Sequence, residues 1–449
     1  MSQQRLNRGA LPMFKLTFPL AMEQFFRILV SSIDTMMLSG YSEQAVAGVG
    51  LVAQYVFFLN LLFSVIGTGT SILLAQYLGA QKSDEELNHI AQASSVMITI
   101  ISLVLSAIVI FGTGPLLSCY DLEPEVRQFA WEYFVIFGGI ASFFTAFSSL
   151  QGAVLRSYGY TKETMYVTII ANIINVLGNA IALYGPFGLP VLGVKGVAAS
   201  SSISMVASFI LLGIIIQRKK DVMFSMKGLR KTPRRVYQLI LSVGVPTAGE
   251  SLSYNISQIV IMAMISTLGT FVMSAQVYTQ TIVRFVFIIT MAIGSAVQIK
   301  AGYYVGAREY DTAYRKIFKY SAIATFCSVS FILLTNLIKS PVISMFTKQP
   351  EIAQIVSKLL IGSIYIEFGR SLNLIYVGAL KGSGDIRFPV GYGIISMWSI
   401  IVLGGWFLGI KLGLGIMGFW LAIGTEETSR GIVMLFRWKS RKWQQNTLV

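Results

Sequence analysis

The chain has 449 residues, of which 54% are hydrophobic and only 12% are charged. A soluble protein of this size needs more charged residues to cover its surface, so the composition indicates a polytopic membrane protein. The net charge of +15 comes from basic residues dispersed among short loops, which argues against a nucleic-acid-binding face. Two cysteines are too few for a disulfide framework, and His89 has no second His or Cys nearby, so we expect no metal site.

Twelve apolar segments are long enough to cross ~30 Å of hydrocarbon as helices. They lie near residues 14–38, 50–76, 91–113, 128–152, 164–185, 196–217, 238–264, 273–300, 317–338, 354–379, 389–410 and 416–436. We therefore predict an all-α membrane protein with twelve transmembrane helices. The first segment lacks a small-residue cleavage site, so we interpret it as a span and not as a removable signal peptide.

The distribution of lysine and arginine predicts the orientation in the membrane. With the N-terminus inside, the cytoplasmic segments hold 24 of the 35 basic residues and the external loops hold six. Cytoplasmic loops of membrane proteins carry such an excess. Both termini are therefore predicted to be cytoplasmic, in a multi-pass protein of the cell (inner or plasma) membrane.

The stretch 19–84 recurs at an offset of 227 residues without a gap. The matched pairs are Pro19 and Pro246, Glu23 and Glu250, Ile66 and Ile293, Gly67 and Gly294, Tyr77 and Tyr304, Gly79 and Gly306, Ala80 and Ala307, and Asp84 and Asp311. A looser echo links the turn Leu155–Gly159 after the fourth span to Leu380–Gly384 after the tenth. Such a duplication predicts two lobes of like topology, related by an axis along the membrane normal.

The longest basic linker separates the two copies. We predict an N-terminal six-helix lobe over residues 1–217, a basic cytoplasmic linker over 218–237, a C-terminal six-helix lobe over 238–436 and a basic cytoplasmic tail over 437–449. The fold is thus expected to be two pseudo-symmetric six-helix bundles.

Three ionisable residues, Glu23, Arg27 and Asp34, lie on one stripe of the first span. Inside a membrane such residues cost several kcal/mol unless they are paired, wetted or used. Glu23 and Arg27 are four residues apart and can neutralise each other. Asp34 has no acid or base within one turn, so low-dielectric surroundings favour its neutral form and allow it to exchange a proton or to balance a substrate cation. A purely structural aspartate is the alternative, and Ile261 stands at this position in the second copy.

The fifth and sixth spans offer polar side chains that could surround Asp34. Asn172, Asn175 and Asn179 share one face of the fifth span, and an amide can bond a carboxyl group in either protonation state. Ser201, among the serines that begin the sixth span, could join them, although small-residue helix packing explains serines equally well.

The second half carries a different set of intramembrane charges. They are Glu250, Arg284, Lys300, Glu367, Arg370, Glu426, Glu427 and Arg430. Glu367 with Arg370, and Glu426 or Glu427 with Arg430, are helical neighbours of opposite sign, so we favour an ion-paired network over a second ion site. The candidates for structural ion pairs are Glu23, Arg27, Glu250, Glu367, Arg370, Glu427 and Arg430.

Aromatic and methionine side chains on the same helices are candidates for lining a substrate cavity, because they make adaptable surfaces for flat apolar cations. These candidates are Met37, Tyr55, Tyr254, Tyr278 and Phe287. Side chains of this kind more often contact lipid or other helices.

Several motifs together resemble the multidrug and toxic compound extrusion (MATE) family, and within it the bacterial DinF-like branch. They are Pro19, Ile33-Asp34-Thr35 with Gly40, the turns Leu155–Gly159 and Leu380–Gly384, Asn175 and Asn179 followed by Tyr184-Gly185, and Gly193-x-x-Gly196. The resemblance covers essentially the whole chain. It implies two bundles forming a V, and export of cationic amphipathic compounds in exchange for protons or sodium ions. It also implies that Asp34 is the coupling carboxylate, surrounded by Asn175, Asn179 and Ser201.

The chain departs from the family pattern at three positions. Some relatives carry a second acid where this chain has Asn179, which leaves Asp34 as the only acid of that site. Sodium-coupled relatives carry acids where this chain has Tyr254 and Arg370, and a guanidinium disfavours a bound sodium ion. We therefore expect a proton-coupled antiporter, not an enzyme, that works without a cofactor and transports protons in preference to sodium.

Two other transport functions stay open. A lipid-linked oligosaccharide flippase would need a cationic cavity, which Arg27, Arg284, Lys300 and Arg370 could supply if unpaired, and a sodium-coupled exporter is the second alternative. An enzyme is disfavoured because the chain has no HExxH, GxSxG or Cys/His cluster. The expected partners are membrane lipid and organic cations, with no nucleic acid, and the protein is expected to be monomeric.

Overall fold

The computed structural model describes residues 11–449, so the first ten residues of the predicted N-terminal lobe lie outside the described part. All regular elements between residues 11 and 449 are helices, and each of the twelve predicted spans is helical. The first half contains α2 (Met13–Tyr41), α3 (Glu43–Gly79), α4 (Asp84–Ser118), α5 (Pro124–Tyr133), η1 (Phe134–Ile140), α6 (Ser142–Ser157), α7 (Thr161–Tyr184), η2 (Pro186–Gly188), α8 (Gly193–Arg218) and η3 (Leu229–Lys231).

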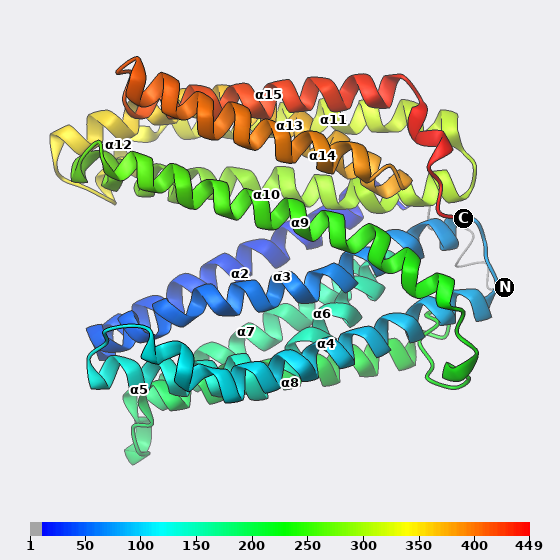
Figure 1. The fold of residues 1–449 in the computed structure, drawn as a ribbon, viewed down its shortest axis with the longest axis horizontal. Helices are drawn as coiled ribbons and strands as arrows, with labels where there is room; N and C mark the ends of the chain where they lie inside the picture. The colour runs from blue at the N-terminus through cyan, green and yellow to red at the C-terminus, as the bar shows by residue number, and fades with distance from the viewer. Residues whose placement is uncertain (1–10) are drawn as a thin grey trace. The chain divides into compact units, whose positions relative to one another are not determined.

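The second half contains α9 (Arg234–Ser266), α10 (Thr270–Gly306), α11 (Tyr310–Leu337), α12 (Lys339–Ser344), α13 (Pro350–Ser383), α14 (Arg387–Ser396), η4 (Met397–Leu403), η5 (Trp406–Lys411), α15 (Ile416–Lys439) and η6 (Lys442–Gln445). Figure 1 follows these helices from α2 in blue to α15 in red. The fourth predicted span is built from α5, η1 and α6, and the eleventh from α14, η4 and η5.

Eight helices of the described chain are long and apolar enough to cross a membrane, and a bent pair, 124–140 with 142–157 at 49°, makes a ninth. The remaining predicted spans, α2, α9 and α15, are less apolar because they carry charged residues such as Asp34, Glu250 and Arg430. They have 29, 33 and 24 residues, and even 24 residues extend about 36 Å as a helix. Their length is therefore sufficient to span the hydrocarbon.

The chain forms two compact units. One consists of the described residues up to Leu74 together with Lys82–Val245, and the other consists of Ala75–Gln81 together with Pro246–Val449. The stretch 218–237, expected from its charge to be a linker, lies wholly within the first unit. Gln92 of α4 holds it there, because its amide nitrogen donates to the carbonyl oxygens of Ser225 and Lys227 at 2.9 and 2.7 Å.

The end of α3 packs closely on α10 in the second unit. A Cβ atom at Gly79 would lie 2.2 Å from the carbonyl oxygen of Tyr303, and one at Gly306 would lie 2.0 Å from that of Gln76. Gln76 and Tyr303 are themselves separated by the repeat offset. The two contacts are therefore equivalent, and they explain why both copies have glycine at this position.

Replacing Gly306 by alanine is expected to lower the free energy of unfolding of the purified protein by roughly 1–3 kcal/mol, because the added methyl group meets backbone that cannot move aside. A thermal or denaturant midpoint measured in detergent checks this. The control is Gly391→Ala in α14, where a Cβ atom meets nothing within 4 Å. Equal midpoints for the two variants would contradict the close packing of α3 on α10.

Candidate functional site

Asp34 lies on α2 with its carboxylate facing α7. The amide nitrogen of Asn179 donates to one carboxylate oxygen of Asp34 at 2.8 Å. The amide of Asn175 satisfies its neighbours when its nitrogen faces Asp34, at 3.0 and 3.2 Å from the two carboxylate oxygens, and its oxygen accepts from the Ser201 hydroxyl at 3.0 Å. Asn175, Asn179 and Ser201 are buried, whereas Asp34 is half-buried. The structure thus brings the four predicted residues together.

Close packing of α7 on α8 positions the amides of Asn175 and Asn179 beside Asp34. A Cβ atom at Gly178 would lie 2.2 Å from the Ser200 hydroxyl, so only glycine permits this approach. Ser200 also donates to the carbonyl oxygen of Asn175 at 2.9 Å. Asn172, the third amide of the predicted face, forms no hydrogen bond with Asp34 in the described chain.

Tyr133 of α5 is a neighbour that sequence reasoning missed. It is hydrogen-bonded to Ser201 and lies within electrostatic range of Asp34. The sequence held no signal for it, because α5 is a separate helix and Tyr133 matches no spacing on α7 or α8.

The Asp34 carboxylate has polar partners but no cationic one within residues 11–449. Burying an unpaired carboxylate costs free energy, which uptake of a proton removes. The carbonyl oxygen of the Asn179 amide has no partner in the described structure, so a rotated amide can accept a hydrogen bond from protonated Asp34. The site can therefore bond this carboxyl group with or without a proton.

An ion pair recurs in both units at positions related by the repeat. In the first unit, Arg156 donates to Glu23 at 3.3 Å, and Arg27 adds a contact at 3.0 Å. In the second unit, Lys381 donates to Glu250 at 2.6 Å. Arg156 and Lys381 belong to the echoed turns after the fourth and tenth spans, whose pairing role sequence reasoning did not recognise.

The second unit contains further ion pairs around Arg370. Its guanidinium donates to Glu367 at 2.6 Å and to Glu427 at 3.1 Å. Ser328 donates to Glu367 at 3.0 Å, and Asn373 donates to Glu427 at 2.8 Å. Arg370 is therefore held between two carboxylates.

Arg430 pairs with Glu426, one of the two acids proposed from helical spacing, and with a second acid that the spacing did not indicate. It donates to Glu250, on another helix, and its nearest approach to Glu426 is 3.8 Å. Glu427 turns toward α13 and pairs with Arg370. Consecutive residues of a helix point about 100° apart, so Glu426 and Glu427 reach different partners.

The basic residues that a cationic cavity would need are not all free. Arg27 is paired with Glu23, and Arg370 is paired with two acids. Lys300 is 1% exposed and lies 5.7 Å from the centre of the Tyr304 ring. Arg284 is exposed and forms no ion pair within the described residues.

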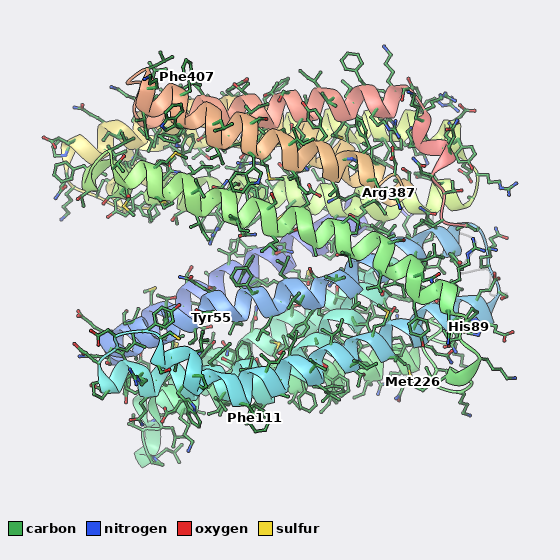
Figure 2. All side chains as sticks on the ribbon, viewed as in Figure 1. Tyr55, His89, Phe111, Met226, Arg387 and Phe407 are labelled. Carbon is green, nitrogen blue, oxygen red and sulfur yellow. The ribbon has the colours of Figure 1, made fainter. Side chains whose placement is uncertain are left out.

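The predicted cavity-lining side chains are spread over both units. Tyr55, labelled in Figure 2, approaches the hydroxyl of Tyr120 at 2.5 Å. Tyr278 packs 5.8 Å from the ring of Phe346, and Phe287 lies 5.0 Å beneath Arg370. Met37 packs against a buried cluster around Leu38, and Tyr254 is 44% exposed. Their contact with a substrate stays a prediction.

Two comparisons of sequence identify the family. The MatE family model matches residues 19–181 and 246–407, two stretches that begin 227 residues apart. The chain is 37% identical over 433 residues to the uncharacterized transporter YisQ of Bacillus subtilis strain 168, covering 96% of this chain and 95% of that one. It is 27% identical to the probable multidrug resistance protein NorM of Halalkalibacterium halodurans, covering 95% and 94% of the two chains.

A solved structure shares the fold. The crystal structure described as MATE in the bent conformation matches with a TM-score of 0.89 and 19% identity, over 98% of this chain and 96% of that one. The double match of the family model reproduces the internal repeat. The chain therefore belongs to the MatE family of membrane transporters and has the all-helical, twelve-span fold of that family.

Proposed function

We propose that this chain is a multidrug efflux antiporter that exports cationic amphipathic compounds in exchange for protons, with Asp34 as the coupling carboxylate. The observation that supports this most is the bonding of Asp34 by the amides of Asn175 and Asn179 without a cationic partner in the described residues. A carboxyl group in such surroundings can change its charge without losing its hydrogen bonds. No covalent step is needed, so the protein acts as a transporter and not as an enzyme.

The mechanism needs one carboxyl group with two competing occupants. When Asp34 is ionised, its negative charge attracts the substrate cation. When a proton from outside binds, the attraction is lost, the amides rotate and the substrate leaves. Return of the transporter to the inward-facing state delivers the proton to the cytoplasm. Because proton and cation exclude each other from Asp34, alternating access couples the two fluxes.

The second unit supports protons over sodium as the coupling ion. Arg370 occupies a position where sodium-coupled relatives are expected to carry an acid, and its guanidinium is held by Glu367 and Glu427. A fixed positive charge there repels a bound metal cation. The pairing of Arg27 and Arg370 also weighs against an oligosaccharide flippase, which would need these cations for a pyrophosphate group.

The proposed setting is the cell membrane, with both termini in the cytoplasm and a monomer surrounded by lipid. The excess of basic residues in the predicted cytoplasmic segments supports this orientation.

Proteoliposomes separate the possible coupling ions. A pH gradient at equal sodium concentrations is expected to drive transport of a fluorescent organic cation such as ethidium, because only protons compete for Asp34. A sodium gradient at equal pH is expected to drive none. Transport that follows the sodium gradient alone would contradict proton coupling, and transport of neither kind would contradict the antiport itself.

A further inference from the structure

The second unit contains two chains of ion pairs that meet on α15. One runs from Lys381 through Glu250 to Arg430 and approaches Glu426. The other joins Glu367, Arg370 and Glu427. None of these seven side chains is more than 16% exposed, so water does little to stabilise a charge that lacks a partner.

The charges in these two chains do not balance. There are four carboxyl groups, Glu250, Glu367, Glu426 and Glu427, but only three basic groups. The pair of Lys381 with Glu250 repeats that of Arg156 with Glu23 in the first unit. We therefore count the charges of Lys381 and Glu250 as neutralising each other. Two arginines then remain for three carboxyl groups.

Glu426 is the carboxyl group left with the weakest partner. Arg370 donates to Glu367 and Glu427 within 3.1 Å, whereas the nearest cationic nitrogen to Glu426 belongs to Arg430 at 3.8 Å. Arg430 also donates to Glu250, so its positive charge is shared between two carboxyl groups. Glu426 is 2% exposed.

The other groups around Glu426 do not supply the missing charge. The Ser396 hydroxyl donates to one of its oxygens at 2.7 Å. Glu427 on α15 and Glu250 on α9 lie within electrostatic range of Glu426, and both are acids. Tyr254 of α9 also lies within electrostatic range, and a phenol supplies no positive charge. Glu426 therefore has two other acids nearby but only one arginine, which it shares with Glu250.

We propose that Glu426 is a second proton-binding site, distinct from Asp34, which binds and releases a proton within the working pH range. With a proton on Glu426, the seven groups carry three negative and three positive charges, so their net charge is zero. Its loss places an additional negative charge among buried groups, at a cost that the shared Arg430 only partly offsets. The pH therefore sets the charge of the second unit as well as that of the Asp34 site.

A second observation within the cluster is consistent with a proton there. Asn373 is 5% exposed and donates to Glu427, but its amide oxygen has no hydrogen-bond partner in the described structure. This oxygen can accept an O–H group from a neighbouring protonated carboxyl if the amide rotates. Asn373 can therefore bond Glu427 in either protonation state, and because Arg370 stabilises the charge on Glu427 the proton belongs on Glu426.

Infrared difference spectroscopy of the purified protein in lipid tests this, since the C=O stretching band of a protonated carboxyl group is distinct and shifts in heavy water. Acidification from mildly alkaline to mildly acidic pH is expected to produce such a band in the wild type. In the spectrum of Glu426→Gln this band should lack the contribution of one carboxyl group. In the spectrum of Asp34→Asn it should lack the contribution of a different carboxyl group. The matched control is Glu351→Gln, at an exposed glutamate of α13, which should leave the band unchanged.

Two results would overturn the proposal. If the Glu426→Gln difference spectrum equals that of the wild type, Glu426 neither gains nor loses a proton in this pH range. If sodium or potassium added at constant pH removes the part of the wild-type band that Glu426→Gln lacks, a metal cation and not a proton is the natural occupant of this site. Should Glu426→Gln fail to fold, Ser396→Ala provides the same test, because losing its hydrogen bond must shift the frequency of a protonated Glu426; an unshifted band overturns the proposal.

Discussion

Replacing Asp34 by asparagine is expected to abolish export of an organic cation driven by a pH gradient, down to the level of liposomes without protein. Asparagine has nearly the shape of the protonated carboxyl group, so the bonds to Asn175 and Asn179 can largely remain and the fold is kept. The variant cannot become negatively charged, however, so protons no longer regulate the site. Transport in proteoliposomes with an imposed pH gradient measures the effect.

Substrate binding by the same variant gives an independent result. In the wild type, affinity for an organic cation should rise with pH because ionised Asp34 attracts it. In Asp34→Asn this dependence should be flat, with affinity at alkaline pH reduced about 5- to 150-fold, the usual range of a coupling between two sites. Asp34→Glu, which keeps a titratable group, is the control and should retain part of the transport. Undiminished pH-driven export by Asp34→Asn would refute Asp34 as the coupling group.

Replacing Glu250 by glutamine is expected to destabilise the protein by roughly 3–5 kcal/mol, because among residues 11–449 this acid alone accepts from both Lys381 and Arg430. These two cations are buried, with side-chain exposures of 11% and 7%. An amide of the same shape cannot compensate either charge. The midpoint of thermal or denaturant unfolding in detergent measures the loss.

The repeat provides a matched control for this variant. Glu23 occupies the corresponding position in the first unit, but its partners Arg27 and Arg156 are 57% and 25% exposed. These arginines are less buried than Lys381 and Arg430, so Glu23→Gln should cost less than Glu250→Gln. Equal losses for the two variants would show that burial of the cations does not determine the effect.

The spans were predictable from the sequence because the thickness of the hydrocarbon sets a length that apolar segments must reach. This held even for α2, α9 and α15, where charged residues interrupt the apolar pattern. The grouping of Asp34 with Asn179 was also predictable, since the amides share one helical face and a buried carboxylate needs donors. The first inference depends on one helix at a time, whereas the second also used the family resemblance, which implies that these residues surround Asp34.

Contacts between helices were harder to predict. Helical spacing could propose Glu426 or Glu427 for Arg430, but it could not show that Glu427 faces Arg370 on α13. For the same reason it missed Tyr133, and it missed Lys381 because a lysine at a turn after a span resembles an ordinary cytoplasmic anchor. Such partners depend on how neighbouring helices pack, which a periodic pattern does not specify.

The equivalent contacts of Gly79 and Gly306 constrain both copies of the repeat in the same way. Each glycine touches the backbone three residues before the other one, at Tyr303 and Gln76. One sequence position therefore serves the same crossing twice, once from α3 and once from α10. A side chain larger than hydrogen at either position meets the same obstacle, a backbone carbonyl group that cannot rotate away.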